Sequence, residues 1–176
     1  MDILTSADIP YVLFETDATW FEDPVELFSN RLNGLEDFDL TVPVKGYDGG
    51  SWDTLGFNPM LVAATNGSKM FMNELKETLN NDTKLYDQDV MNQLCASQRN
   101  GIICRQFEYS EVADGKWFKM DENERTIPQI LNNNFNSGTK NKETRQALNG
   151  FWFLATKTDQ CVIAKVKMFM TKYNLT

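Results

Sequence analysis

The chain has 176 residues, of which 41% are hydrophobic and 12% aromatic, enough to bury the core of one globular domain. Its 17 lysines and arginines against 25 aspartates and glutamates give a net charge of −8, which argues against a surface that binds nucleic acid. No segment approaches the roughly 20 consecutive apolar residues that span a bilayer. The first residues also lack the basic start and the apolar stretch of a signal peptide.

Apolar residues recur alternately at strand and helix periods, which predicts an α/β domain. In the segment 68–79, for example, Phe71, Leu75 and Leu79 fall on one helical face. The polar segment 132–141 is expected to be a loop or lid. In chain order we expect a strand at 9–15, a helix at 25–32, strands at 39–44 and 56–64, helices at 68–79 and 87–96, strands at 102–107 and 116–120, and helices at 144–154 and 162–173.

Two acids follow the first expected strand. The apolar run 11–14 leads into Glu15 and Asp17, and Pro10 and Pro24 bound the segment, so we expect a buried strand whose carboxyl end carries both acids. Two carboxylates placed there would hold a hard divalent cation, which would neutralise phosphate oxygens. Because acid-x-acid is a common pattern, the alternative is that the pair is only a charged strand end and turn.

The same segment resembles the strand, acid pair and tryptophan-x-x-Asp-Pro stretch of the nucleotide-diphospho-sugar transferase family, glycosyltransferases with a type A fold. Three later segments resemble the family in the same order: GFNPMLV at 56–62, DQDVMN at 87–92, and ILNNNFNSG at 130–138 with Lys142 and the residues 150–152 behind it. The resemblance covers roughly residues 8 to 155, and four weak motifs in the right order indicate the family. It implies an α/β fold of three layers, in which a mixed sheet is flanked by helices.

The resemblance implies a site for Mn²⁺ or Mg²⁺. Glu15 and Asp17 occupy the positions of the family's two aspartates, and Asp17 is the expected direct ligand. Glu15 is one methylene longer than the usual aspartate, which a cation with flexible oxygen coordination would accept. Asn132 stands where the family has a metal-binding histidine, and this chain contains no histidine. A carboxamide oxygen is a neutral and weaker ligand than a carboxylate.

Four further residues receive roles from the resemblance. Asp87 and Gln88 are expected beside the acceptor or the transferred sugar, where a carboxylate can act as a base and an amide can pair with hydroxyls. For Asp87 the alternative is a helix cap. Asn58 is expected to face the donor, or else to form a turn before Pro59. Lys142 is expected to meet a phosphate, or else to be a solvated lysine.

The expected function is therefore metal-dependent transfer of a sugar from a nucleotide-diphosphate sugar to a hydroxyl of a glycan or glycoprotein acceptor. Members of the family carry an additional α/β unit of about 100 residues before the acid pair. A single βαβ unit already takes roughly 30 residues, whereas the acid pair of this sequence is at Glu15 and Asp17. We therefore expect residues 1–176 to be a single domain, the C-terminal catalytic part of an N-terminally truncated fold. The alternative is a non-catalytic remnant that binds a glycan or a protein.

Cysteine spacing leaves two interpretations open. Cys95 and Cys104 either form a disulfide across a short polar segment or are small buried thiols, because three cysteines match no known framework. Asn-x-Ser/Thr acceptors for glycosylation begin at Asn66, Asn81 and Asn174, and they would suit a protein of a secretory lumen. The family resemblance likewise implies the Golgi or another secretory compartment.

Overall fold

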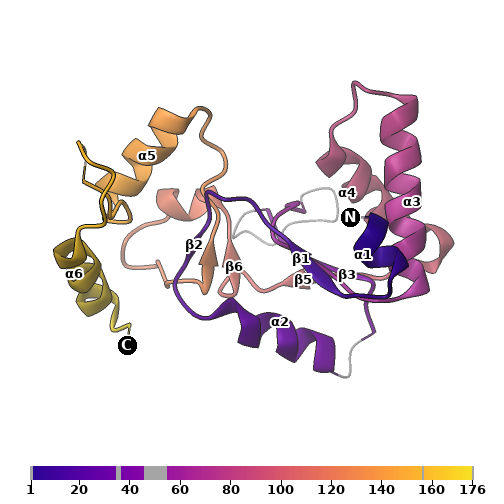
Figure 1. Ribbon diagram of the computed structural model, residues 1–176, viewed down its shortest axis with the longest axis horizontal. Coiled ribbons are helices and arrows are strands. Elements are labelled where there is room, and N and C mark those ends of the chain that lie inside the picture. The colour runs from indigo at the N-terminus through magenta and orange to yellow at the C-terminus, as the bar shows by residue number, and fades with distance from the viewer. Residues whose placement is uncertain (1, 35–36, 46–54, 156, 176) are drawn as a thin grey trace.

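A computed structural model describes residues 2–34, 37–45, 55–155 and 157–175. The described chain is mixed α/β, with two small mixed sheets and helices around them (Figure 1). The N-terminus lies beside α1 and α3, and the C-terminus lies beside α6 at the opposite end of the molecule. No helix in these ranges has the length and hydropathy to cross a bilayer. The helices are α1 (Asp2–Ser6), α2 (Pro24–Asn33), α3 (Asn66–Asn81), α4 (Asp87–Ser97), α5 (Thr139–Leu148) and α6 (Ile163–Tyr173).

The first sheet has the strand order β1-β4-β3-β5. Its outer pair β1–β4 and its central pair β4–β3 are antiparallel, whereas β3 and β5 are parallel. The register of β3 and β5 places Leu40 opposite Cys104 and Pro43 opposite Phe107. The strands are β1 (Tyr11–Leu13), β3 (Leu40–Pro43), β4 (Met60–Val62) and β5 (Cys104–Phe107).

Helices cover both faces of this sheet, as expected for three layers. Along β4, Met60 and Val62 pack into the core below α3 and α4, while Leu61 between them packs into the core beside α2. This alternation follows from the two-residue period of a strand. All three side chains are 0% exposed, which marks β4 as a central strand.

The second sheet contains β2 (Thr19–Trp20), β6 (Val112–Ala113) and β7 (Ile130–Leu131), in the order β2-β7-β6. Ile130 faces the core beside α2, and the next residue, Leu131, faces an aromatic core that contains Phe151 and Phe169. The second sheet thus lies between the first sheet and the α5–α6 end of the molecule (Figure 1).

Cys95 of α4 and Cys104 of β5 form a disulfide, so the first of the two cysteine interpretations is correct. Both cysteines are buried, and the bond ties α4 to the edge strand of the first sheet. Asn66 and Asn81, which begin two of the glycosylation triplets, are exposed at the start and end of α3. The third triplet ends at Thr176, outside the described residues.

Several predicted elements differ from the structure. The expected strand at 116–120 is wrong: residues Gly115–Lys119 form a 3₁₀ helix, η3, because the Asp114 side chain accepts the Lys116 backbone N–H and caps its start. The expected helix at 144–154 begins earlier, at Thr139, and ends at Leu148, because Gly150 adopts a positive φ of 80° and the chain turns away. The expected loop 132–141 therefore ends at Gly138.

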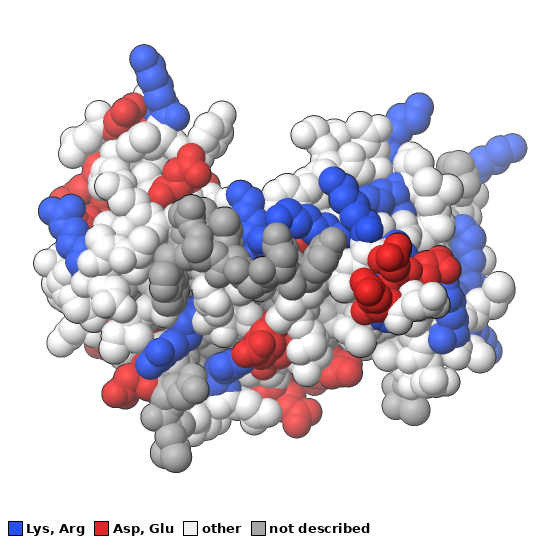
Figure 2. Space-filling model, turned by 180° about the vertical axis from the view of Figure 1, so that it is seen from behind, with Lys and Arg blue, Asp and Glu red and all other residues white. Residues whose placement is uncertain are grey.

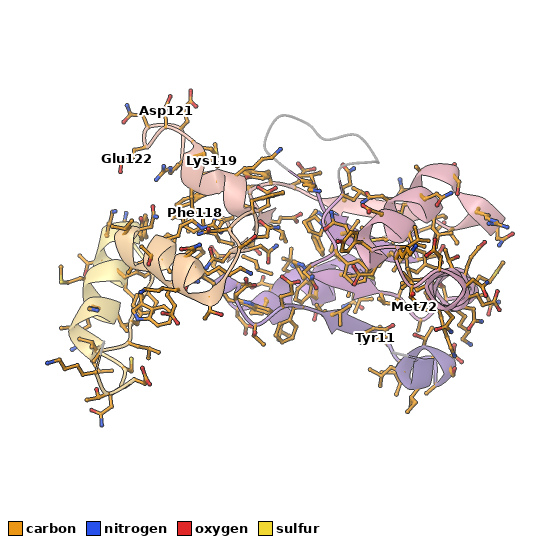
Figure 3. The ribbon with its side chains drawn as sticks, turned by 90° about the horizontal axis from the view of Figure 1, so that it is seen from above. Tyr11, Met72, Phe118, Lys119, Asp121 and Glu122 are labelled. Carbon is orange, nitrogen blue, oxygen red and sulfur yellow. A yellow bond between two sulfur atoms is a disulfide. The ribbon has the colours of Figure 1, made fainter. Side chains whose placement is uncertain are left out.

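The first strand is also shorter and less buried than expected. It spans Tyr11–Leu13 instead of 9–15, and all three residues are half-buried, because β1 is an edge strand. Its inner face is nevertheless part of the core, since Tyr11 and Leu13 pack against the cluster that contains Met72. Figure 3 shows Tyr11 and Met72 on this side of the molecule. At the other end, Phe118 packs inward, and Asp121 and Glu122 lie on an outer turn.

Candidate functional site

The loop between β1 and β2 connects the two sheets and lines a cavity of about 950 Å³. Phe14, Glu15 and Thr16 are exposed, and Asp17 is half-buried before β2 begins. The opposite wall comes from Asn133 and from one side of α5, and residues 151–154 close the end. The cavity is therefore built from segments that are more than 100 residues apart in the sequence, as the separation of 125 residues between Asp17 and Lys142 shows.

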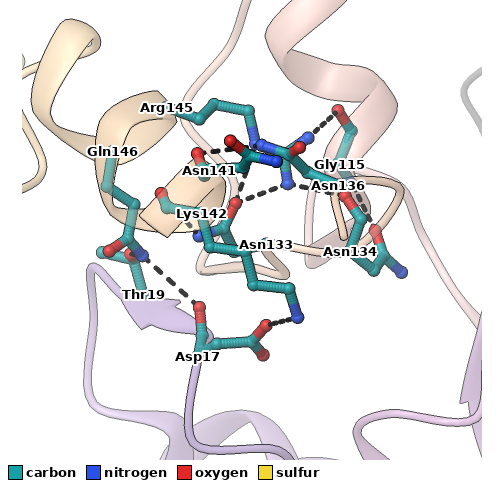
Figure 4. A network of polar contacts seen from close by, with 10 residues as sticks. All are labelled: Asp17, Thr19, Gly115, Asn133, Asn134, Asn136, Asn141, Lys142, Arg145 and Gln146. Atoms are coloured by element: carbon teal, nitrogen blue, oxygen red, sulfur yellow. Dashed lines mark hydrogen bonds and ion pairs between the residues drawn. The ribbon is translucent and has the colours of Figure 1, made fainter. Parts of the chain in front are cut away.

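An ion pair crosses this cavity. Lys142 Nζ of α5 donates to Asp17 Oδ2, and the two side chains are 31% and 23% exposed (Figure 4). Asp17 Oδ1 is buried and has no hydrogen-bond partner among the described residues. One helical turn after Lys142, Gln146 Nε2 donates to the backbone oxygen of Asp17 at 3.4 Å and to Thr19 Oγ1 at 3.5 Å. One face of α5 thus contacts both the side chain and the backbone of the acid loop.

A second set of contacts holds α5 through Arg145, three residues after Lys142. Arg145 Nε donates to Asn133 Oδ1 at 2.8 Å and its Nη2 donates to the backbone oxygen of Asn134 at 2.6 Å. The guanidinium carbon lies 4.5 Å from the centre of the Phe118 ring. Asn133 Nδ2 in turn donates to the backbone oxygen of Lys142 at 3.2 Å. Arg145 and Asn133 therefore fix the backbone from which Lys142 extends (Figure 4).

Glu15 lies in a field of like charge. Partial burial raises the pKa of its carboxyl, the charges of Asp17 and Asp87 raise it further, and Lys142 opposes them. Because a carboxylate influences a pKa only from nearby, Asp87 at the start of α4 lies close enough to act on the same site. Glu15 and Asp17 thus both lie near one lysine, and an added cation would relieve the repulsion between the two acids.

The raised pKa of Glu15 predicts a pH-dependent change in stability. A carboxyl with a raised pKa stabilises the fold below its ordinary value of 4.5, and this contribution is lost as pH rises through the raised value. We therefore expect Glu15→Gln to raise the melting temperature near pH 7 and to leave it unchanged near pH 4. Thermal unfolding followed by circular dichroism at both pH values tests this, with Glu122→Gln on the outer turn as control. Equal melting temperatures of Glu15→Gln and wild type at both pH values would contradict it.

Asn58 and Asn132, which the resemblance placed at the donor and the metal, contact each other. Asn132 Nδ2 donates to the backbone oxygen of Asn58 at 2.6 Å, and its side chain is buried at the end of β7. Among the described residues the cavity wall includes Asn133, but neither Asn132 nor Asn58. The structure therefore brings Glu15, Asp17 and Lys142 together at the cavity and places the two asparagines behind it.

Asp87 and Gln88 form the start of α4. Asp87 is exposed, and its Oδ1 accepts the backbone N–H of Gln88 at 2.7 Å, so part of its carboxylate supports the first helical turn. The N-cap position itself belongs to Tyr86. The backbone oxygen of Gln88 accepts Asn92 Nδ2 at 2.8 Å, while the Gln88 side chain is half-exposed. Neither residue lines the cavity, although the charge of Asp87 reaches Glu15.

Sequence reasoning missed Asn133, Arg145 and Gln146. Arg145 and Gln146 follow Lys142 at helical spacings of three and four residues, a signal that was available once a helix was expected there. The predicted helix begins at residue 144 and excludes Lys142, so this spacing is not recognised from the sequence prediction. Asn133 has no comparable signal, because it lies in a run of three asparagines.

The residues at this cavity fit a divalent cation that is bound by only a few protein ligands. The described residues contain no group of three histidine, cysteine or acidic side chains placed to hold a metal. They do offer the unpaired buried oxygen of Asp17 and the crowded carboxylate of Glu15. Mg²⁺ in phosphate-handling sites is commonly bound by one or two carboxylates, with the substrate phosphates completing the shell. The donor set at this cavity has that character.

The model of the nucleotide-diphospho-sugar transferase family matches residues 1–146. No curated protein and no solved structure matches the chain. The matched range contains the acid loop, the start of α4 and the cavity-facing side of α5, whereas α6 lies beyond it.

Proposed function

Because this chain belongs to the nucleotide-diphospho-sugar transferase family, we propose that it transfers a sugar from a nucleotide-diphosphate sugar to an acceptor hydroxyl, with Mn²⁺ or Mg²⁺ at Glu15 and Asp17. The family supports the glycosyltransferase-type function and the nucleotide-sugar donor. The observation that carries the assignment of the site is the pairing of Asp17 with Lys142 across the cavity. In a cation–diphosphate group, the acid would bind the cation and the lysine would bind the diphosphate.

The chemistry requires stabilisation of a leaving diphosphate. When the bond from the sugar to the diphosphate breaks, negative charge grows on the phosphate oxygens, and a bound divalent cation would act there as a Lewis acid. Lys142 supplies a mobile positive charge to the same oxygens. The N-terminus of α5 lies at the cavity, since Thr139 lines it. The first turn of α5 contains no acid and Gly138 provides no side-chain cap, so the helix dipole is uncompensated there and favours a phosphate.

Asn132 and Asn58 take supporting positions in this proposal. The Asn132 amide nitrogen is already committed to the Asn58 backbone oxygen, so the Asn132 side-chain oxygen is the atom left to ligate the cation. Asn58 itself is half-buried two residues before β4, and we propose that it faces the donor.

We place the acceptor, a glycan or glycoprotein, on the open side of the cavity toward α4. Asp87 would accept the proton of the attacking hydroxyl, and Gln88 would orient that hydroxyl through its amide. Trp152 lines both this cavity and a neighbouring one of about 680 Å³, so its ring offers a surface against which a longer saccharide can pack.

The assignment of Asp87 as the base predicts a large kinetic effect. We expect Asp87→Asn to lower kcat for release of nucleoside diphosphate by about 10²- to 10⁴-fold, with little change in nucleotide affinity. A coupled assay of nucleoside diphosphate release from a panel of nucleotide sugars and oligosaccharides measures this. Asp89→Asn, an exposed acid two residues along the same helix, is the matched control. An active enzyme whose kcat is unchanged in Asp87→Asn would remove Asp87 from the reaction.

A non-catalytic binding module is the second candidate. It is favoured by Asn132, whose neutral amide stands in the position of a metal-binding histidine and makes a buried hydrogen bond. This alternative predicts that saccharides bind but that no nucleoside diphosphate is released from any donor. The same coupled assay, combined with a saccharide-binding measurement, therefore separates the two functions.

We further propose that residues 1–176 act as the C-terminal catalytic part of a transferase domain in the lumen of the Golgi or another secretory compartment. The disulfide between Cys95 and Cys104 supports an oxidising compartment, because such bonds rarely persist in the cytosol. Retention of this disulfide in protein isolated from its native compartment would test the location.

A further inference from the structure

We propose that Lys142 serves as the resident cation of the donor site, neutralising Asp17 before the donor arrives and moving to the diphosphate when donor and divalent cation bind. This inference rests on the proposed function and adds a regulation of the same site. It assigns to one side chain two successive partners, an acid of the protein and a phosphate of the donor. Free divalent cation and Lys142 then compete for Asp17.

The geometry supports competition because Lys142 contacts the same carboxylate that the cation would use. Lys142 Nζ occupies Asp17 Oδ2, and only Asp17 Oδ1 is left without a partner among the described residues. Both side chains are about two-thirds or more shielded from solvent, with 31% and 23% exposed. Screening by water is therefore weaker than for a surface ion pair, and a second cation near Asp17 would be repelled by the ammonium.

The structure also shows which part can move. Asn133 binds the backbone oxygen of Lys142, and Arg145 binds Asn133 and Asn134, so the helix backbone is held in place. Only the flexible four-carbon stem of Lys142 is free to redirect its ammonium. A diphosphate in the cavity offers oxygens with more negative charge than Asp17 alone. Lys142 therefore exchanges its partner without a movement of α5.

This arrangement predicts effects of opposite sign on two ligands. Without Lys142, free cation meets an unopposed acid pair and binds more tightly, whereas the diphosphate loses a positive partner and binds more weakly. By linkage, Lys142 makes the binding of cation and diphosphate more cooperative than it would be with Asp17 alone. A lysine that only supported the fold would weaken both ligands together.

The test uses the full chain with Lys142→Met and the control Lys140→Met, which removes the same charge from an exposed position of α5. Mn²⁺ binding without nucleotide is measured by electron paramagnetic resonance, and uridine diphosphate binding at saturating Mn²⁺ is measured by calorimetry. For Lys142→Met we expect Mn²⁺ to bind about tenfold tighter and uridine diphosphate about tenfold weaker, each ~1.4 kcal/mol. Lys140→Met should remain within about twofold of wild type for both ligands.

The outcomes separate this inference from the proposed function. Equal Mn²⁺ affinity in wild type and Lys142→Met would overturn the inference and leave the cation site in place. Weaker binding of both ligands would likewise overturn it, and would make Lys142 a structural residue. Absence of Mn²⁺ binding in both proteins would overturn the inference and the metal site together. Lys142→Gln also removes the charge and should likewise bind Mn²⁺ about tenfold tighter than wild type, so it tests the inference even if Lys142→Met fails to fold.

Discussion

Asp17→Asn is expected to abolish cation-dependent binding of nucleoside diphosphate, with a loss in affinity of about 100-fold or more. Asp17 holds the unpaired buried oxygen of the site, and asparagine removes the charge that attracts the cation while keeping the shape. Even substitutions behind metal ligands cost about 10- to 100-fold in affinity, so loss of a direct ligand should reach or exceed the upper end of that range. Calorimetric titration with uridine diphosphate in the presence of Mn²⁺ measures the change.

The control for this substitution is Glu22→Gln, which removes one exposed negative charge after β2 and outside the cavity. It should bind the nucleotide as wild type does. If Asp17→Asn bound with unchanged affinity, Asp17 would have no part in the donor site, and both the metal assignment and the role of Lys142 would fail. The melting temperature of each variant must first show that the chain is folded.

Phe151→Ala is expected to cause the largest loss of stability, about 3–5 kcal/mol in the free energy of unfolding, because it leaves a cavity in a packed aromatic core. Phe151 is 4% exposed, and its ring is surrounded by other rings of that core. Chemical denaturation followed by tryptophan fluorescence measures the loss. The ring centres that surround Phe151 lie at 5.5 Å for Phe21, 5.9 Å for Trp117, 5.8 Å for Phe118, 5.3 Å for Phe169 and 6.2 Å for Tyr173.

Leu148→Ala provides the comparison, because Leu148 lies three residues before Phe151 and is 82% exposed. Its truncation should change the free energy of unfolding by less than about 0.5 kcal/mol. Phe151 also lines the cavity of the acid loop, so its loss should loosen the end of the cavity formed by residues 151–154. A loss below about 1 kcal/mol for Phe151→Ala would mean that the aromatic core collapses around the gap or contributes little to the fold.

The α/β class was predictable because apolar periodicity is a local property. Leu75 in α3 and Val90 in α4 are buried where the helical spacing placed them, and the alternation along β4 follows strand geometry. Local periodicity carries no information on which strands pair. The antiparallel pairing of β1 with β4 and the two-residue strands of the second sheet depend on distant segments, so the sequence alone did not reveal them.

The 3₁₀ helix at Gly115–Lys119 shows that the propensity of individual residues does not determine the local structure. Trp117 and Phe118 are aromatic and favour strands by propensity, but the cap from Asp114 and the packing of both rings into the aromatic core determine the local structure. Tertiary packing overrides propensity here. The net charge of −8 likewise does not give the distribution of charge in space. Basic and acidic side chains are interspersed on the face seen in Figure 2.

The sequence likewise predicted only part of the candidate site. Glu15, Asp17 and Lys142 were assigned from motifs in the family resemblance, and the structure places them at one cavity although Asp17 and Lys142 are 125 residues apart. The hydrogen bond between Asn132 and Asn58 could not be anticipated, because it requires the ends of two strands from different sheets to meet. Motifs therefore identified the charged groups, and the fold determined which of them face the cavity.

Titration of the folded wild-type chain with uridine diphosphate, with and without Mn²⁺, determines whether the acid loop and Lys142 form one site for a cation and a diphosphate. We expect calorimetry to show saturable binding in the presence of Mn²⁺ and strongly weakened binding after its removal with a chelator. Absence of binding, or binding of equal strength without the cation, would contradict such a site.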